Sequence, residues 1–563
     1  MDKKFMTIDG KTVEINGERN ILEVARKAGI DIPAFCYDPE LSVYGACRMC
    51  VFENERGAID ASCSAQPRDG MVIKTNTPKL RKYRKTVLEL LLSNHCRDCT
   101  VCPKNNKCKL QEFALRYNLS DVRFPNDYND ASKDTSSYSI VRDSKKCILC
   151  GKCVRTCNEI QNVGAIDYGF RSSKMKIVTA FDGEIANSPC VGCGQCAAVC
   201  PVGAITVKDD SEKVWNALSD PNTEVSVQVA PAVRVALGKE FGLKEGEPLM
   251  GKLVFALKAL GFDKVYDTSL GADMTIFEEA AEFADRLANG GVMPMFTSCC
   301  PAWIKHAEHK HPELLNNIST CRSPMQMFAS VIKHEYKGDK KHVHVAVMPC
   351  TAKKFEAKRD EFTAKDGSKT VDYVLSTQEI IAMIKTAGIN FAEAENCPPD
   401  NPFEEFTGGG VIFGVTGGVT EAVLRRLSTD KSKKALLSIA FNDVRGMKGV
   451  KETTIPYGDK EVRIAIVSGL KNAESVIQAL KNGEHFDFIE VMACPGGCVA
   501  GGGQPFGTNA TKEVRGKALY SADKMLSIKR SEENPLMLSL YDGVLKGRVH
   551  ERLHVHYNHK EEE

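Results

Sequence analysis

Two kinds of hydrophobic pattern alternate through the second half of the chain. Short apolar runs with many β-branched residues predict buried strands at residues 225–230, 343–347, 411–415, 462–466 and 488–491. Between them, apolar residues recur at helical spacing at residues 250–260, 275–287, 378–385, 420–427 and 472–480. Strands that alternate with helices in this way predict a two-lobed α/β region with mainly parallel sheets.

The N-terminal region has shorter patterns. Alternating segments around residues 6–8 and 12–15 predict strands, and Asn16-Gly17 follows as a hairpin-type signal. A helix is expected over residues 21–28, closed by Gly29.

A further helix is expected to begin in the basic run 79–85 and to become apolar at residues 87–92. The basic run is either an ordinary solvated helix face or a landing patch for an acidic electron carrier. The polar residues 126–140 form a linker candidate.

Composition narrows the class of protein. The chain has 563 residues, 43% of them hydrophobic, and a net charge of +2, which gives no support to a nucleic-acid or membrane role. No apolar run of 18 residues occurs and no apolar segment follows Met1, so we expect a soluble, cytoplasmic protein. The 23 cysteines are grouped at metal-ligand spacings, which favours reduced thiolates over disulfides.

The first cysteine group has the spacing C-x10-C-x2-C-x12-C and comprises Cys36, Cys47, Cys50 and Cys63. It resembles the [2Fe–2S] ferredoxin-like domains at the front of large redox enzymes, and a structural zinc site is the alternative. The second group, H-x3-C-x2-C-x5-C, comprises His95, Cys99, Cys102 and Cys108. It predicts a [4Fe–4S] cluster, with zinc as the alternative and Cys96 competing with His95 as the fourth ligand.

An internal repeat follows, with the spacing C-x2-C-x2-C-x3-C in both copies. This is the bacterial two-cluster ferredoxin pattern, in which the fourth cysteine of each copy ligates the other cluster. One predicted [4Fe–4S] cluster is therefore held by Cys147, Cys150, Cys153 and Cys200, and the other by Cys190, Cys193, Cys196 and Cys157.

Three stretches of the α/β region place cysteines at the ends of apolar segments. They are residues 297–303, 343–353 and 488–505. If the fold brings them together, Cys300, Cys350, Cys494 and Cys498 form a four-thiolate site for an iron–sulfur cluster or zinc. Two glycine-rich stretches, 408–410 and 416–418, fit no nucleotide-binding fingerprint and are interpreted as loops that allow close approach.

Cys299 directly precedes the predicted ligand Cys300. Side chains of adjacent residues point in different directions, so the two cysteines are not expected to hold the same cluster. Cys299 is either a thiol that exchanges protons or a small buried residue. A predicted helix starting with a capping box at Thr275 carries Glu279, Glu282 and Arg286 on one face. These residues form either a surface salt bridge or a buried carboxylate relay.

The C-terminal tail, from about residue 512, has helical patterns and ends with four histidines among charged residues. The histidines His550, His554, His556 and His559 are too loosely spaced to define a metal site, and a surface helix is the preferred interpretation.

The three cysteine stretches resemble the signatures of [FeFe]-hydrogenases, and the accessory motifs resemble those of the large monomeric clostridial type. The matching residues are Thr297-Ser298-Cys299-Cys300-Pro301, 348–356 and 490–498. The resemblance implies an active-site [4Fe–4S] cube joined by one thiolate to a two-iron unit that carries CO, cyanide and azadithiolate. It also implies one [2Fe–2S] and three accessory [4Fe–4S] clusters.

Carried over by position, the resemblance assigns a role to each residue of the site. Cys300, Cys350, Cys494 and Cys498 would hold the cube, and Cys498 would bridge to the two-iron unit. Protons would pass from Cys299 through Glu279, Ser319 and Glu282 toward Arg286.

The resemblance also assigns the wall of the pocket. Lys353 would hydrogen-bond a cyanide, Pro231 would line the pocket, and Met348 and Met492 would pack on the two-iron unit. Ala232 stands where some relatives have a serine that donates to a cyanide. Cys96, Cys321 and Cys397 receive no role.

The implied function is reversible H₂ formation, 2H⁺ + 2e⁻ ⇌ H₂, with ferredoxin as electron partner, maturation proteins that deliver the two-iron unit, and a monomeric chain. The expected domains span residues 1–80, 81–125, 126–209, 210–510 and 511–563. The fold class is α+β multidomain, with ferredoxin-like iron–sulfur domains before the two-lobed α/β domain. The competing hypotheses are a non-catalytic protein of iron–sulfur assembly or H₂ sensing, and an electron-transfer subunit of an NADH-linked complex.

Overall fold

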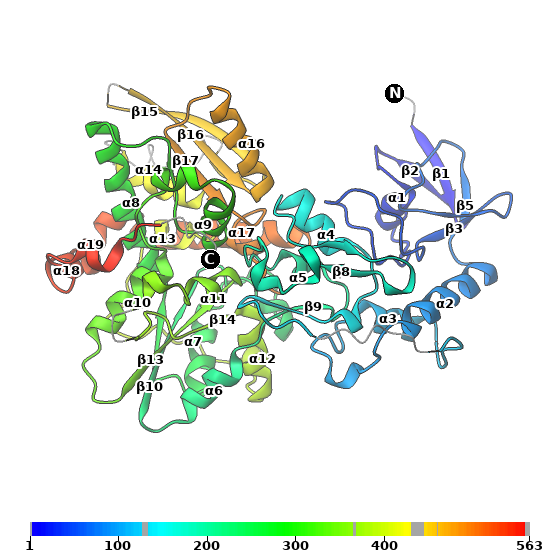
Figure 1. Ribbon diagram of the computed structural model, residues 1–563, viewed down its shortest axis with the longest axis horizontal. Helices are drawn as coiled ribbons and strands as arrows, with labels where there is room; N and C mark the ends of the chain where they lie inside the picture. The colour runs from blue at the N-terminus through cyan, green and yellow to red at the C-terminus, as the bar shows by residue number, and fades with distance from the viewer. Residues whose placement is uncertain (1–2, 126–132, 364–366, 429–443, 459, 558–563) are drawn as a thin grey trace.

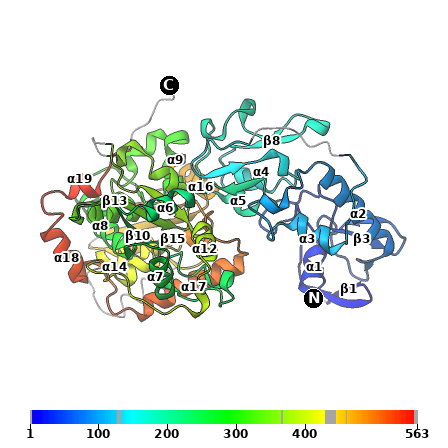
Figure 2. The ribbon, with the colours of Figure 1, turned by 90° about the horizontal axis from the view of Figure 1, so that it is seen from below.

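The structure, a computed structural model, describes residues 3–125, 133–363, 367–428, 444–458 and 460–557. The chain forms an elongated molecule in which the N-terminal segments lie at one end and the α/β region at the other (Figures 1 and 2). Residues 133–209 lie between them in both views. Within the described residues, no helix is both long and apolar enough to cross a bilayer.

The N-terminal sheet has the order β2-β1-β5-β3-β4. Its strands are β1 (Lys4–Ile8), β2 (Lys11–Ile15), β3 (Val51–Asn54), β4 (Ile59–Ala61) and β5 (Val72–Lys74). The helix α1 (Ile21–Lys27) buries Ile21, Leu22 and Val24 and ends before Gly29, whose φ is +77°, as predicted. The next helix, α2 (Pro78–Ser93), confirms the helix expected at the basic run.

The hairpin signal at Asn16-Gly17 is wrong. Strands β1 and β2 do form an antiparallel hairpin, but their turn is Asp9-Gly10. Both turn residues have positive φ, +51° and +83°, as a tight hairpin turn of this kind requires. Gly17 also has positive φ, but it lies after the end of β2 and forms no hairpin turn.

The middle segment is built from short elements around two groups of cysteines. Strands β6 (Ile140–Arg142) and β9 (Ile205–Val207) pair antiparallel, as do β7 (Asp167–Gly169) and β8 (Lys176–Val178). Two short helices, α4 (Lys152–Arg155) and α5 (Gln195–Val199), each carry the third cysteine of one copy, Cys153 and Cys196. Of the predicted linker 126–140, residues 126–132 lie outside the described residues.

The α/β region confirms the prediction of two lobes with mainly parallel sheets. One sheet, β11-β10-β13-β14, is wholly parallel and consists of β10 (Thr223–Val229), β11 (Lys264–Asp267), β13 (Lys341–Met348) and β14 (Tyr373–Ser376). The other, β12-β17-β16-β15, consists of β12 (Met295–Phe296), β15 (Val450–Tyr457), β16 (Lys460–Ser468) and β17 (Phe488–Met492), and only β15 runs antiparallel.

Helices cover both sheets. Those on the first lobe include α6 (Ser211–Ser219), α7 (Met250–Ala259), α10 (Pro324–Glu335) and α12 (Thr377–Thr386). Those on the second include α9 (Pro301–Lys310), α14 (Gly418–Leu427) and α16 (Leu470–Lys481). The helices predicted at 250–260, 378–385, 420–427 and 472–480 are all present.

The strand predicted at residues 411–415 is wrong, because residues 408–412 form the helix α13 (Gly408–Ile412). An apolar run of this length does not distinguish a buried helix from a buried strand. The glycines before it are part of the helix, and a Cβ at Gly410 would lie 2.3 Å from the carbonyl oxygen of Ser269. They let α13 pack directly on α8 (Ser269–Asn289), so the interpretation of 408–410 as a loop is also corrected.

The capping box at Thr275 is a further correction. Helix α8 begins six residues earlier, at Ser269, and Thr275 lies buried inside it. Its hydroxyl donates to the carbonyl oxygen of Gly271 at 3.1 Å instead of capping a helix. Glu279, Glu282 and Arg286 are nevertheless on this helix, as predicted.

The C-terminal segment contains α17 (Asn509–Met525), α18 (Pro535–Asp542) and α19 (Val549–Leu553). In this segment, α18 and α19 lie at the outer side of the α/β region, whereas α17 lies near the middle segment (Figure 1). The expected surface location holds for His550 and His556, whereas His554 is buried, with 9% of its surface exposed. His559 lies outside the described residues.

Candidate functional site

A largely apolar cavity lies between the two lobes, where the carboxyl ends of strands from both sheets meet. Its volume of about 90 Å³ leaves room for several water-sized groups. Four of the predicted cluster ligands and the adjacent thiol line it together: Cys299, Cys300, Cys350, Cys494 and Cys498. Thiols from Cys299 to Cys498 thus converge on one chamber.

Four of the five thiols follow the end of a strand, and Cys498 comes after the glycine turn that follows Cys494. Cys299 and Cys300 follow β12, and Cys300 is the residue before α9. Cys350 follows β13, and Cys494 follows β17. The backbone amide of Ala493 donates to Sγ of Cys300 at 3.4 Å, which ties the ends of β12 and β17 together.

Gly497 shows why glycine lies between the last two cysteines. Its φ is +88°, and a Cβ there would lie 2.5 Å from the backbone nitrogen of Thr416. Only glycine combines this backbone conformation with so close an approach. The turn that brings Cys498 back to the cavity therefore depends on this residue.

Burial makes the free thiolate unfavourable at four of the cavity cysteines, Cys299, Cys350, Cys494 and Cys498. Burial, followed by the charges of neighbouring cysteines, raises the pKa of Cys494 well above its usual value. The same causes raise the pKa of Cys350 to about 11. A bound metal reverses this preference, because a coordinated thiol is deprotonated outright. The donor set therefore fits a metal–sulfur cluster.

Lys353 is the cation that lines this cavity. Its Nζ lies 2.7 Å from Oε2 of Glu356 and donates to the carbonyl oxygen of Cys299 at 3.2 Å. Burial lowers the pKa of Lys353, but the carboxylate of Glu356 outweighs this and raises it, so the ammonium stays charged. A fixed positive charge thus faces the place where an anionic group would bind.

The remaining predicted wall residues also line the cavity: Pro231, Ala232, Met348 and Met492. Ala232 is further held by Gln504, whose Nε2 donates to its carbonyl oxygen at 2.8 Å. Met325 and Phe413 line the same cavity, although no sequence pattern singles them out.

A line of polar groups leads from the cavity along α8. Glu279 is fully buried, and its Oε1 accepts from the backbone amide of Ser298 at 3.3 Å, next to Cys299. Burial, then the charge of Glu282, raises the pKa of Glu279 to about 8. Burial, then the charge of Glu279, raises the pKa of Cys299 well above its usual value.

The line continues outward through Ser319, whose hydroxyl donates to Oε2 of Glu282 at 2.8 Å. Oε1 of Glu282 lies 2.6 Å from a guanidinium nitrogen of Arg286. The salt bridge considered from the sequence is therefore real, but it is not a surface pair, since the two side chains are only 14% and 12% exposed. The same residues also form the outer end of the polar line.

The accessory cysteines also gather in sets. Sγ of Cys36 lies 3.4 Å from Sγ of Cys47 in the first set. One small cavity is lined by Cys147, Cys150, Cys153 and Cys200, which is the crossed combination expected from the repeat. Burial raises the pKa values of the thiols in the other set, Cys157, Cys190, Cys193 and Cys196. The charges of neighbouring cysteines add to this at Cys157, Cys193 and Cys196.

His95 and Cys96 both line the cavity that contains Cys99, Cys102 and Cys108. Burial lowers the pKa of His95 to about 4, so its ring is neutral. Its Nε2 is buried without a hydrogen-bond partner, which suits a metal ligand and favours His95 over Cys96.

The middle segment contacts the main cavity directly. Nε2 of Gln195 lies 3.1 Å from Sγ of Cys494, and a Cβ at Gly194 would lie 2.4 Å from Oγ1 of Thr351. A Cβ at Gly502 would in turn lie 2.4 Å from the carbonyl oxygen of Cys193. Sequence reasoning missed Gln195, and only its position between Cys193 and Cys196 could have drawn attention to it.

All 23 cysteines lie in described residues and are free thiols, as expected for metal binding. Cys321 lies behind the cavity wall, fully buried beside Glu282. Cys397 packs at the edge of the first lobe's core, away from the cavity.

Known protein families match the chain in five consecutive stretches. They are a 2Fe-2S iron-sulfur cluster binding domain (5–78), the NADH-ubiquinone oxidoreductase-G iron-sulfur binding region (84–123), a 4Fe-4S dicluster domain (146–204), the C-terminal domain of the iron only hydrogenase large subunit (223–502) and the iron hydrogenase small subunit (509–560).

Two curated relatives align over nearly their whole length. The NADP-reducing hydrogenase subunit HndD of Solidesulfovibrio fructosivorans is 41% identical over 99% of both chains. Iron hydrogenase 1 of Clostridium pasteurianum is 37% identical over 98% of this chain and 100% of its own. A solved structure, a variant of [FeFe]-hydrogenase HydA1 from Chlamydomonas reinhardtii, is 37% identical, with a TM-score of 0.54, over 62% of this chain and 98% of its own.

A more distant match bears on the non-catalytic hypothesis. Cytosolic iron-sulfur assembly component 3 of Rattus norvegicus is 31% identical over 67% of this chain and 84% of its own. Its match is shorter and weaker than those of the two hydrogenases, and it leaves a third of this chain unmatched.

Proposed function

The chain belongs to the iron-only, or [FeFe], hydrogenase family, whose members are oxidoreductases that act on H₂, and from this premise we propose that it catalyses 2H⁺ + 2e⁻ ⇌ H₂ with ferredoxin as electron partner. The observation that carries the proposal is the convergence of four cysteines, a fifth thiol and a buried lysine on one apolar cavity.

Cys300, Cys350, Cys494 and Cys498 would hold a [4Fe–4S] cube, and Cys498 would also bridge to the two-iron unit with its CO, cyanide and azadithiolate ligands. When bound, this cluster supplies the metal chemistry that joins protons and electrons. The protein excludes water with apolar walls, where Met348 and Met492 pack. Lys353, held by Glu356, would donate a charge-assisted hydrogen bond to a cyanide. Pro231 and Ala232 complete the wall.

Protons would move along the polar line, from Cys299 through Glu279, Ser319 and Glu282 to Arg286. The hydrogen bond from Ser319 to Glu282 supports the outer half of this route. A pKa of about 8 for Glu279 supports the inner half, because a relay acid works best when its pKa is near the operating pH. The raised pKa of Cys299 keeps it a thiol, which has a proton to give.

Electrons would use a separate route formed by one [2Fe–2S] and three [4Fe–4S] clusters. The ligand sets adjoin one another: Cys36 and Cys108 pack in the same apolar cluster as Cys147 and Cys150. At the other end, the charge of Cys193 acts on Cys494 and raises its pKa. This arrangement favours two entry points that join at the Cys147 set and continue to the main cavity.

The basic helix α2 is the candidate docking surface for ferredoxin. Arg84 in this run is buried and donates to the carbonyl oxygen of Met49 at 3.0 Å, so it supports the fold. Lys82 and Lys85 line the adjacent groove, which has a volume of about 870 Å³. Positive charge there would steer an acidic carrier toward the N-terminal clusters.

Purified protein, matured anaerobically so that maturation proteins deliver the two-iron unit, tests the function. We expect H₂ from reduced viologen and infrared bands of CO and cyanide, and a matured protein without H₂ evolution would reject catalysis. H₂ evolution with reduced viologen but not with reduced ferredoxin would favour a subunit of a nicotinamide-linked complex. The relative HndD is named as a subunit of an NADP-reducing hydrogenase. A single species at the monomer mass is expected in solution.

A further inference from the structure

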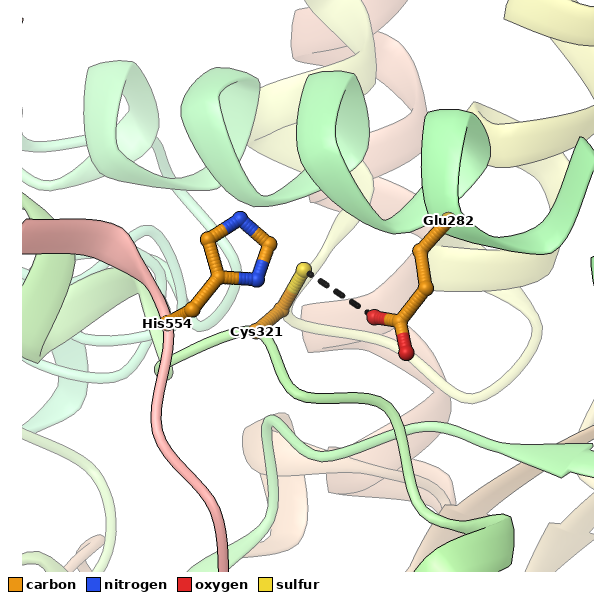
Figure 3. A group of neighbouring side chains, drawn as sticks. All are labelled: Glu282, Cys321 and His554. Carbon is orange, nitrogen blue, oxygen red and sulfur yellow. Dashed lines mark hydrogen bonds between the residues drawn. The ribbon is translucent and has the colours of Figure 1, made fainter. Parts of the chain in front are cut away.

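Three potential metal ligands meet at the outer end of the polar line. Glu282 comes from α8, Cys321 from the segment that follows Ser319, and His554 from the C-terminal segment just after α19. One ligand atom of each lies within 4.8 Å of the others. Figure 3 shows the thiol of Cys321 between the imidazole and the carboxylate, with Sγ 3.9 Å from Oε2 of Glu282.

The surroundings of His554 prepare its ring to bind a cation. Nε2 lies 3.1 Å from Oε2 of Glu278, and this carboxylate also accepts from the hydroxyl of Tyr541. A carboxylate acceptor fixes the proton on Nε2 and leaves the lone pair on Nδ1. Nδ1 is the ring nitrogen that faces Cys321 in Figure 3. Carboxylate–histidine pairs of this kind orient the ring at many metal sites.

The hydroxyl of Thr320 is the group that an incoming ion would displace. It lies 2.8 Å from Nδ1 of His554 and 3.1 Å from Oε2 of Glu282. One small hydroxyl thus already bridges two of the three candidate ligands. Because a hydroxyl turns about a single bond, it can give up both contacts without a shift of the backbone.

Charge and donor type indicate which ion fits. Burial, followed by the charges of Glu279 and Glu282, raises the pKa of Cys321 well above its usual value, so the thiol is unfavourable as a free anion. A thiolate, a carboxylate and a neutral imidazole together balance the charge of a divalent cation. Sulfur, nitrogen and oxygen donors in one set suit Zn²⁺, which would complete its four ligands with water.

The other group of this kind in the described residues contrasts with it. His306 and His311 both direct Nε2 at the same oxygen, Oε1 of Glu474, at 2.8 and 2.9 Å. Those ring nitrogens are engaged with the carboxylate, and the group contains no thiol. This second group therefore provides a matched control and not a competing site.

We propose that Glu282, Cys321 and His554 form a binding site for a thiophilic divalent cation, Zn²⁺ in the first instance. Binding forms a metal–sulfur bond and releases the thiol proton to solvent, with no change of oxidation state. Because Glu282 becomes a ligand, the bound ion takes it out of the proton route and inhibits turnover. The proposed cation binding is independent of the proposed function, whereas the inhibition rests on it.

The binding is tested on the cluster-loaded holoenzyme, with anaerobic Zn²⁺ titration against a chromophoric chelator. The expected result is one tight site in the wild type that weakens by at least about tenfold in Cys321→Ser and His554→Gln. His311→Gln is the matched control and keeps the wild-type affinity. X-ray absorption at the zinc edge is expected to show one sulfur ligand. Equal Zn²⁺ affinity in the wild type and Cys321→Ser overturns the site.

H₂ evolution from reduced viologen then separates the two halves. Without Zn²⁺, Cys321→Ser evolves H₂ at the wild-type rate, since Cys321 lies outside the proposed route. With Zn²⁺ at about ten times the wild-type dissociation constant, the wild type loses about tenfold in rate, whereas Cys321→Ser keeps about half of its rate or more because its weaker site is at most half filled. Binding without inhibition overturns the regulatory half. Absence of H₂ in every metal-free sample instead contradicts the proposed function and leaves the binding result intact.

Discussion

The side-chain amide of Gln195 donates to Sγ of Cys494 at 3.1 Å, so a residue of the middle segment contacts a cavity thiol directly. The same nitrogen donates to the carbonyl oxygen of Ala500 at 3.0 Å. Hydrogen bonds to cluster sulfurs stabilise the reduced, more negative state and raise the reduction potential. Gln195 therefore belongs to the electronic environment of the proposed cube.

Gln195→Leu removes this hydrogen bond and keeps a similar volume. We expect the midpoint potential of the cube to fall by on the order of 40 mV, which corresponds to about 1 kcal/mol lost from the reduced state. Redox titration followed by electron paramagnetic resonance measures it. A potential equal to that of the wild type would show that the contact has no electronic effect.

Cys299→Ala tests the thiol at the start of the proton route. We expect turnover to fall by about 10²–10⁴-fold, the usual contribution of a positioned acid or base. The infrared bands of the two-iron unit are expected to remain, because Cys300 and not Cys299 is the proposed ligand. Normal H₂ evolution in this variant would exclude the proton role and leave Cys299 as a small buried residue.

Glu282→Gln distinguishes the relay from the ion pair. An amide cannot carry the proton, so turnover is expected to fall by about 100-fold. The hydrogen bond from Ser319 can be retained, and the loss of charge next to Arg286 affects mainly stability. Thermal melting of the variant provides the control. Unchanged turnover together with a lowered melting temperature would assign Glu282 to a structural ion pair alone.

Glu279→Gln is expected to change how the stability of the protein depends on pH, and the sign of this change follows from the burial of Glu279. The pKa of Glu279 is raised from its ordinary 4.5 to about 8, so the folded protein favours the neutral acid. The stability due to that preference is complete below pH 4.5 and is lost as the pH rises toward 8. The amide of the variant does not ionise. The melting temperature of the variant minus that of the wild type is therefore expected to increase as the pH rises from about 5 to 8. A constant difference across this range contradicts the raised pKa.

Charge reversal on α2 tests the docking surface. Lys82→Glu combined with Lys85→Glu is expected to lower kcat/KM for ferredoxin about tenfold at low ionic strength, because steering by charge is lost. The rate with reduced viologen serves as the control and is expected to be unchanged. The difference is expected to shrink at high salt. An equal loss with both donors would point to damage to the fold and not to docking.

The cavity could be predicted from sequence because its thiols follow strands of a parallel fold. Parallel strands of one sheet present their carboxyl ends at one edge, which brings together the cysteines after residues 296 and 492. The cysteine after residue 348 ends a strand of the other sheet, so its approach depends on how the two lobes pack. The strand expected at 411–415 failed for a reason the pattern does not contain, namely the tight packing of Gly410 on α8. Whether a short apolar run becomes helix or strand depends on what packs against it, which periodicity alone does not reveal.

Contacts between distant segments were the least accessible to prediction. The sequence pattern favours a surface helix for His554, yet this residue is buried against Thr320, with Nδ1 2.8 Å from the threonine hydroxyl. Gln195 carries no signal beyond its two flanking cysteines. The role of each residue depends on a contact with a partner more than 200 residues away in sequence, which no local pattern identifies.

The close packing of Gly194 on Thr351 and of Gly502 on Cys193 limits how the protein can be shortened for use on electrodes. A cut after residue 209 would remove Gln195 and with it the hydrogen bond to the thiol of Cys494. A cut before residue 133 would discard the N-terminal cluster domains and keep these contacts. A miniature catalyst made from this chain should therefore begin near residue 133.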